Sequence, residues 1–311
     1  MFDAARLLVV AAFAVTALTG IDQEQDGKAT AGDLRRGSAS AASARSATVG
    51  EDERHALLAA QALYRAGLYY LGKRDYDRAE EFLDKSRQII TDIQGEESIG
   101  CATALATLGI LRTWRGQHEE AVASLQRAMA IQAKLLGERH SDYGATVTNL
   151  GGLYLKLGQH DRAATLLQKA VDIAKEQGPA DINYAASLNN LGALYLRTGA
   201  YDKAEPLLRQ ALEIHKQKVG ENHPIFADSL ERLGGLETGK GRYDEAEILL
   251  KRSLTLREKL LEPTHPNLAD SLESYAALLR KLKRDEEAVA LETRAASIRA
   301  SLVKRRSKTG D

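Results

Sequence analysis

Apolar residues recur at helical spacing through two successive segments near the middle of the chain. In the first segment Leu188, Leu191 and Leu194 precede Gly199. In the second segment the apolar positions are Ala204, Leu207, Leu208, Ala211, Leu212 and Ile214. This spacing predicts two amphipathic helices joined by a tight turn. Because one such hairpin cannot bury its own apolar faces, it needs neighbours of the same kind.

The chain contains six copies of this pattern. Each copy has a small residue in its first predicted helix, which we call the marker residue. The markers are Gly67, Gly109, Gly151, Gly192, Gly234 and Ala276. They are separated by 42, 42, 41, 42 and 42 residues, and an alanine stands twelve residues after every one of them. This periodicity predicts an all-α fold of the α-solenoid class, with six helix–turn–helix repeats over residues 51–303.

The glycine markers indicate close packing between helices. A glycine within a helix costs about 1 kcal/mol relative to alanine, so a recurring one is expected where a larger side chain would collide with a neighbouring helix. Four repeats have a second glycine seven residues after the marker, where it can end the first helix in a left-handed conformation. Arg74 and Lys283 take this place in the first and last repeats. End repeats are expected to be atypical because their outer faces meet water.

These motifs resemble the tetratricopeptide repeat, which has 34 residues in its standard form. The longer unit of this chain, with LNNLG, a second helix ending in VGENHP, and HPxxAxSL, resembles the kinesin light chain subtype. The resemblance covers roughly residues 51–303. It implies a right-handed superhelix whose first helices line a concave groove that receives peptide segments of partner proteins.

The composition adds little to this prediction. The 311 residues include 43 basic and 43 acidic side chains, so no net charge attracts nucleic acid or an anionic surface. We therefore expect a protein or peptide partner and no nucleic acid.

The first 20 residues are expected to be a secretory signal peptide. One arginine precedes an uninterrupted apolar run from Leu7 to Leu18, which is shorter than the roughly 20 residues that span a bilayer. An uncleaved N-terminal membrane anchor and a misassigned start of the chain are the alternatives. Residues 21–50 are rich in Ala, Ser and Gly and predict a flexible linker, while residues 304–311 form a basic tail. The chain is thus expected to be exported, to the periplasm or the medium if it is bacterial.

No group of residues predicts catalysis, a metal or a cofactor. Cys101 is the only cysteine, and no nucleophile–base pair is discernible around it. His140, His223 and His265 occupy equivalent positions in successive repeats. Such positions lie at least one helix-packing distance of about 8–10 Å apart, too far to share a zinc ion. Proline follows two of these histidines, which suits the first turn of a helix.

The candidate binding residues lie on one face of the first helices, which we call the polar face. It is made by the residues six, three and two positions before each marker and one position after it. On it, the third to fifth repeats combine small residues with Thr148, Asn149, Asn189, Asn190, Glu231 and Arg232. The resemblance implies that these residues contact a partner. An ordinary solvated helix face is the alternative.

The resemblance also bears on the chemistry of the partner. Asn190 and Arg232 match two positions of a clamp by which some relatives hold a C-terminal carboxylate. Asp228 stands where that clamp has lysine, so recognition of a terminal carboxylate is not expected. Three residues after the marker, Arg112 and Glu237 interrupt a column of tyrosines, and the sequence pattern offers no reason for either.

Together, these features predict a non-catalytic protein–protein interaction scaffold. A kinesin light chain-like cytosolic adaptor would need a heptad coiled coil before the repeats, and residues 21–50 show no heptads. A structural role in envelope assembly is compatible with the same features. An enzyme would need a convergent set of nucleophile, base or metal ligands.

Overall fold

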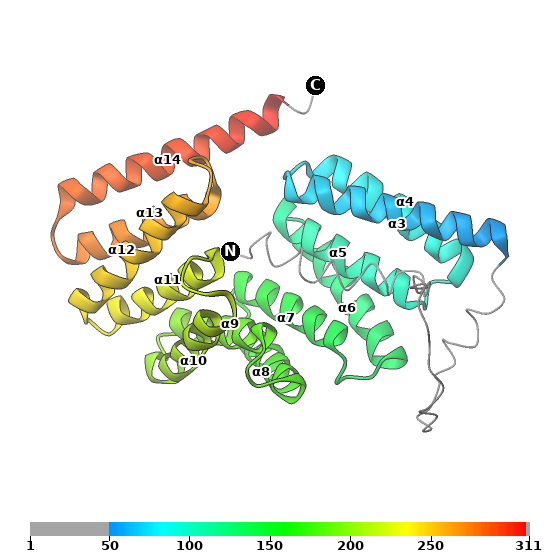
Figure 1. The fold of residues 1–311 in the computed structure, drawn as a ribbon, viewed down its shortest axis with the longest axis horizontal. Helices are drawn as coiled ribbons and strands as arrows, with labels where there is room; N and C mark the ends of the chain where they lie inside the picture. Colours follow the sequence, from blue (N-terminus) through cyan, green and yellow to red (C-terminus); the bar gives the residue numbers. More distant parts are fainter. Residues whose placement is uncertain (1–49, 309–311) are drawn as a thin grey trace, which may run out of the picture. The chain divides into compact units, whose positions relative to one another are not determined.

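A computed structural model of the chain describes residues 50–308, with side chains through residue 301. The predicted signal peptide and residues 21–49 of the predicted linker lie outside the described residues. Within them the chain forms twelve helices and no strand (Figure 1). No helix in this part of the chain is long and apolar enough to cross a membrane.

The described residues form two compact units, 50–146 and 147–308, and each is described by itself. The first unit contains α3 (Glu51–Gly72), α4 (Tyr76–Gln94), α5 (Ile99–Arg115) and α6 (His118–Leu135). Helix α7 (Ser141–Lys156) runs from the first unit into the second. The second unit continues with α8 (His160–Gln177), α9 (Ile182–Arg197), α10 (Tyr201–Val219), α11 (Pro224–Gly239), α12 (Tyr243–Leu260), α13 (Pro266–Lys281) and α14 (Asp285–Lys308). Helix α14 thus continues into the stretch predicted to be a basic tail.

Consecutive helices pack as pairs, and within each compact unit one pair packs on the next. Within repeats, α3 contacts α4, α5 contacts α6, α9 contacts α10, α11 contacts α12, and α13 contacts α14. Between repeats, α4 contacts α5, α8 contacts α9, α10 contacts α11, and α12 contacts α13. Odd-numbered helices are therefore the first helices of the repeats, and even-numbered helices are the second. The predicted all-α fold of the α-solenoid class is confirmed.

The five glycine markers lie where the two helices of a repeat touch. A Cβ atom built on Gly67 would lie 2.6 Å from Leu83 Cγ, and one on Gly109 would lie 2.6 Å from Leu125 Cγ. Real Cβ atoms almost never show such distances. The same contact recurs in the third, fourth and fifth repeats, where the paired leucines are Leu167, Leu208 and Leu250. The glycine column is therefore explained by close helix packing.

The turns within the repeats require a left-handed residue. Gly116, Gly158, Gly199 and Gly241 have φ values of +84°, +74°, +72° and +77°. Arg74 and Lys283 adopt the same conformation with φ values of 61° and 59°, although they carry a side chain. The end repeats thus keep the backbone of the turn without the residue that favours it.

Two charged residues that interrupt the tyrosine column are held by specific partners. Arg112 Nη1 donates to Ser124 Oγ at 2.7 Å, and its Nε donates to Glu80 of the preceding repeat at 3.3 Å. The side chain of Glu237 is only 1% exposed and pairs with Arg209 at 3.2 Å and Arg242 at 2.5 Å. Each charge is therefore paired across helices.

The recurring histidines cap helices. Nδ1 of His223 accepts the N–H of Ile225, and Nδ1 of His265 accepts the N–H of Asn267, both at 3.2 Å. Pro224 and Pro266 occupy the first helical position after them, as predicted. Nδ1 of His140 accepts the N–H of Asp142 in the same way. The column has a structural role at helix N-termini.

Candidate functional site

The six predicted binding residues lie on three first helices of the second compact unit. Helix α7 carries Thr148 and Asn149, α9 carries Asn189 and Asn190, and α11 carries Glu231 and Arg232. In each helix the two residues are adjacent in sequence, so they point in directions about 100° apart around the helix axis. In α9 and in α11, the two adjacent side chains therefore have different surroundings.

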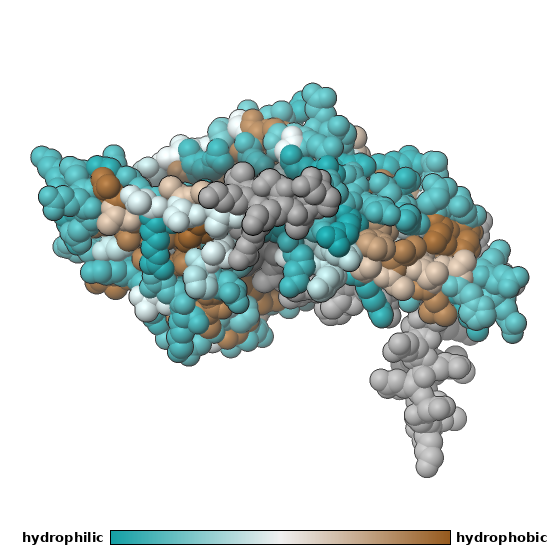
Figure 2. Space-filling view, turned by 90° about the horizontal axis from the view of Figure 1, so that it is seen from above, coloured by the Kyte–Doolittle hydropathy of each residue, from teal (hydrophilic) through white to brown (hydrophobic). Residues whose placement is uncertain are grey.

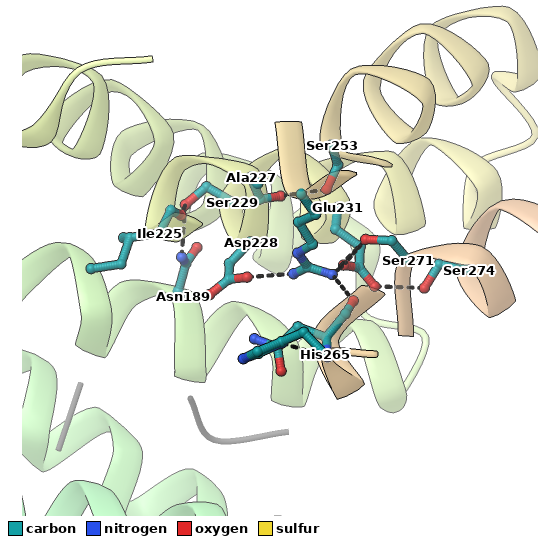
Figure 3. Close-up of polar contacts among 12 residues, drawn as sticks. Asn189, Ile225, Ala227, Asp228, Ser229, Glu231, Ser253, His265, Ser271 and Ser274 are labelled. Atoms are coloured by element: carbon teal, nitrogen blue, oxygen red, sulfur yellow. Dashed lines mark hydrogen bonds and ion pairs between the residues drawn. The ribbon is translucent and has the colours of Figure 1, made fainter. Parts of the chain in front are cut away.

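Asn189 is fully buried and links two repeats. Its Nδ2 donates to Ser229 Oγ of α11 at 2.9 Å (Figure 3). Ser229 Oγ also lies 2.7 Å from Nδ1 of the buried His215 in α10. These contacts join α9, α10 and α11 through one serine hydroxyl. Asn189 therefore holds the fourth repeat on the fifth.

Glu231 occupies the equivalent position in the next repeat and is also bound between repeats. It forms an ion pair with Arg257 of α12 and accepts hydrogen bonds from two serines of α13, Ser271 at 3.2 Å and Ser274 at 2.6 Å (Figure 3). Its side chain retains 16% exposure. Glu231 therefore holds the fifth repeat on the sixth.

Arg257 lies at the centre of this cluster. Its side chain is only 6% exposed and pairs with Asp228 as well as Glu231. It also donates to the Asn267 carbonyl at 2.8 Å and to Ser271 Oγ at 2.5 Å. Burial lowers the pKa of Arg257, but the charges of Glu231 and Asp228 outweigh burial, so its pKa is raised. The guanidinium stays charged and gives two carboxylates one shared cation.

The same arrangement recurs at a constant spacing. Arg257 follows Asp228 by 29 residues and Glu231 by 26. In the sixth repeat, Arg299 bonds Asp270 and Glu273 at the same two separations. In the fourth repeat His215 takes the place of the arginine, and the amide of Asn189 takes the place of the glutamate. In three successive repeats, polar side chains therefore occupy these equivalent positions of the first and second helices.

The other predicted residues lie next to these anchored groups. Asn190 is buried, with 7% exposure. Thr148, Asn149 and Arg232 are half-buried. Because Asn190 and Arg232 follow Asn189 and Glu231 directly, their backbone positions are set by the bonds between repeats. The backbone at Asn190 and Arg232 is thus held in place by the contacts of the residues that precede them.

This arrangement can supply amide, hydroxyl, carboxylate and guanidinium groups to a bound chain. In the described part of the chain, no group of three or more His, Cys, Asp or Glu side chains could hold a metal ion. Cys101 is a free, buried thiol. The groups on the polar face suit hydrogen bonding and ion pairing with a polypeptide.

The residues that sequence reasoning missed include three on the second helices and the serines that bind two of them. His215, Arg257 and Arg299 all stand twenty-three residues after a marker. Ser229 binds His215, Ser271 binds Arg257, and both serines stand five residues before a marker, as does Ser187. The offset comparison that found the glycine markers could therefore have found both columns.

Comparisons with solved structures find related repeats. Putative kinesin light chain TPR-like repeats from Podosopora anserina are 28% identical, with a TM-score of 0.50 over 64% of this chain and 95% of theirs. BtubC (BKLC) from P. vanneervenii is 21% identical, with a TM-score of 0.51 over 80% of this chain and 90% of that one. Rap protein in complex with competence and sporulation factor is 17% identical, with a TM-score of 0.62 over 81% of this chain and 78% of that one. The last two show the fold alone.

Among curated proteins, none matches this chain. The family model of the tetratricopeptide repeat matches five overlapping segments, residues 58–134, 106–176, 145–217, 183–236 and 225–301. These matches span most of the chain and coincide with the helix pairs of the structure. Their extent, together with the 42-residue spacing and the glycine–leucine contacts inside five of the six pairs, shows that this chain belongs to the tetratricopeptide repeat family.

Proposed function

We propose that this protein is a non-catalytic scaffold that binds an extended segment of a partner protein on the polar face of α7, α9 and α11. The tetratricopeptide repeat fold supports a role in protein–protein interaction. The residues proposed to touch the partner are Asn149, Asn190 and Arg232, with Thr148 beside them. Asn189 and Glu231 are proposed to act indirectly, because their side chains bind neighbouring repeats.

The observation that carries this proposal is the fixed position of the backbone beside these residues. In α11, Glu231 is held by Arg257, Ser271 and Ser274, and Arg232 follows it directly in the sequence. A binding residue on a rigid backbone loses less conformational freedom when a partner binds. The bonds between repeats therefore favour binding at the neighbouring positions.

The chemistry of these residues suggests the kind of segment that would bind. Side-chain amides can both donate to and accept from the main chain of an extended peptide. Arg232 would add attraction for an acidic side chain. We therefore expect a segment that is extended, exposes its main-chain polar groups and carries an acidic residue near Arg232.

Peptide-display selection on the purified protein would yield a ligand segment, and calorimetry with variants would then test the site. Asn190→Ala should weaken binding by roughly 0.5–1.5 kcal/mol, the usual net value of one hydrogen bond. Arg232→Ala should cost more and should make affinity less dependent on salt. Lys218→Ala, an exposed change on α10, is the control. Loss of affinity in the control alone would place binding on the second helices and overturn the proposal.

We also propose that the protein is exported. The apolar run from Leu7 to Leu18 behind a single arginine follows the layout of a signal peptide. N-terminal sequencing of the protein from its native host should find a mature chain that begins between about Thr19 and the start of the linker. An intact Met1 in the soluble cytosol would contradict export, and an intact Met1 in the membrane fraction would indicate an anchor.

Two alternative functions share this fold. A cytosolic adaptor is suggested by the resemblance to putative kinesin light chain repeats, and an envelope-assembly factor would equally use a repeat scaffold. Crosslinking in the native host followed by mass spectrometry distinguishes them. An adaptor should capture cytosolic motor or filament subunits, an envelope factor should capture membrane-bound or periplasmic proteins, and neither outcome requires a change in the proposed binding face.

A further inference from the structure

Within the described residues, helix α3 exposes an apolar face. Leu58 is 46% exposed and Tyr69 is 61% exposed. Ala62 is exposed and Ala66 is half-buried between them, and the four residues recur at helical spacing. Figure 2 shows apolar residues gathered on the surface at the end of the view where Figure 1 places α3 and α4. A row of this kind marks an interaction surface.

Later repeats show what normally covers this face. Ala104, Leu108 and Leu111 of α5 are equivalent to Ala62, Ala66 and Tyr69, and all three are fully buried. They lie on the helix that packs against α4 of the preceding repeat. No described helix precedes α3, so its equivalent face has no such cover among residues 50–308.

The aromatic residue on this face is held in place. The Tyr69 ring meets the Tyr70 ring edge to face, with centroids 5.4 Å apart. Tyr70 in turn stacks on Phe82 of α4 at 5.4 Å, and the guanidinium of Arg78 lies 4.8 Å from its ring centroid. A tyrosine that is exposed and already ordered suits a protein interface, because little side-chain freedom is lost on binding.

The charges at the two ends of α3 are complementary to each other. Its first turn contains Glu51, Asp52 and Glu53, and Lys73 and Arg74 follow its last residue. Helix α3 has 22 residues, whereas the other first helices have 16 or 17. A second copy of α3 lying antiparallel would place the acidic end of each helix beside the basic end of the other. The two ends of α3 are therefore complementary in charge, and the exposed Arg54 and Arg65 add positive charge between them.

We propose that α3 is a dimerisation helix that binds α3 of a second copy in antiparallel orientation, with Ala62 near the two-fold axis. Small residues at the centre allow the two backbones to approach, while Leu58 and Tyr69 pack on either side. A helix of this length is about 33 Å long, so a strip about 10 Å wide buries only about 330 Å² per copy. This area is below that of standard interfaces, so the dimer should be weak, with a dissociation constant on the order of 10–100 µM.

Sedimentation velocity of the purified protein between about 1 and 200 µM would test the dimer. The weight-average mass should rise towards twice the monomer mass as concentration increases. Ala62→Glu, which sets two carboxylates opposite each other at the axis, should weaken association at least tenfold. Ala296→Glu adds the same charge to an exposed position on α14 and should leave association unchanged. Circular dichroism checks that both variants are folded.

A charge exchange tests the antiparallel orientation. Glu51→Lys alone should weaken the dimer several-fold through repulsion of Lys73 in the second copy, and Glu51→Lys with Lys73→Glu should restore it. Ala62→Cys should also form a disulfide-linked dimer on mild oxidation. A wild-type protein that stays monomeric at every concentration would overturn the proposal. So would a dimer whose dissociation constant is the same with and without Ala62→Glu.

Discussion

Gly192 of α9 lies directly against Leu208 of α10, because a Cβ atom on the glycine would be 2.6 Å from Leu208 Cδ2. Leu208 is fully buried and cannot turn away into solvent. Gly192→Leu should therefore destabilise the protein by roughly 1–3 kcal/mol through overpacking. Urea or thermal unfolding of the variant measures this loss.

Gly235 provides a matched control for that change. It lies within α11 and is exposed, and a Cβ atom built on it meets nothing within 4 Å. Gly235→Ala should therefore stabilise the protein by about 0.5–1 kcal/mol, since alanine favours the helix. Equal losses for Gly192→Leu and Gly235→Ala would contradict the assigned packing.

Removing Arg257 should be much more damaging than removing Arg299. Arg257→Met leaves Asp228 and Glu231 without their cation, and their side chains are only 14% and 16% exposed. Loss of a partner in a fully buried pair costs about 3–5 kcal/mol, so about 2–4 kcal/mol is expected here. Arg299 is 35% exposed, and Arg299→Met should cost at most about 1 kcal/mol. Comparison of the two denaturation midpoints tests the difference.

The stability should fall in acid partly through Glu205. Hydrogen bonds from Lys240 and Arg209 lower the pKa of Glu205 to about 2, from 4.5 in an unperturbed chain. Because the unfolded chain binds the proton more tightly, the stabilisation is complete above pH 4.5 and is lost as the pH falls towards 2. Glu205→Gln should be less stable than wild type at pH 7, and the difference should shrink in acid. Glu213→Gln, an exposed change on the same helix, should show no such convergence.

The turns of the end repeats offer a stabilising substitution. Lys283 adopts φ of 59°, a left-handed conformation that costs a residue with a side chain roughly 1 kcal/mol. Lys283→Gly should therefore raise the free energy of unfolding by up to about 1 kcal/mol. Gly199→Ala, at the equivalent turn with φ of +72°, should lower it by a similar amount. Thermal melts of both variants would show opposite shifts.

Much of the fold could be read from the sequence because it depends on local patterns. Helical periodicity locates the helices, and the 42-residue step shows that each pair has a neighbour like itself. Gly192 and Gly199 could be assigned to a helix contact and a turn, respectively, because glycine is unfavourable in a helix unless packing requires it and tolerates positive φ. The structure confirms both assignments.

The candidate site was less accessible to this reasoning. Helical spacing places Asn189 and Asn190 on the same side of α9, but it does not show that Ser229 of the next repeat covers Asn189. The two residues of that bond are 40 positions apart. Which residues of a helix remain open depends on how the following repeat is placed. The binding roles of Asn149, Asn190 and Arg232 stay predictions.

The sequence by itself determined the helices, the repeat length and the contacts inside each repeat, since these follow from periodicity and from the special conformations of glycine. Only the tertiary structure decided the roles of Arg112 and Glu237, which interrupt the tyrosine column. Arg112 is paired with Glu80, 32 residues away, and Glu237 with Arg209, 28 residues away. A buried or half-buried charge is stable only beside its counter-charge, and no local pattern shows which distant side chain supplies it.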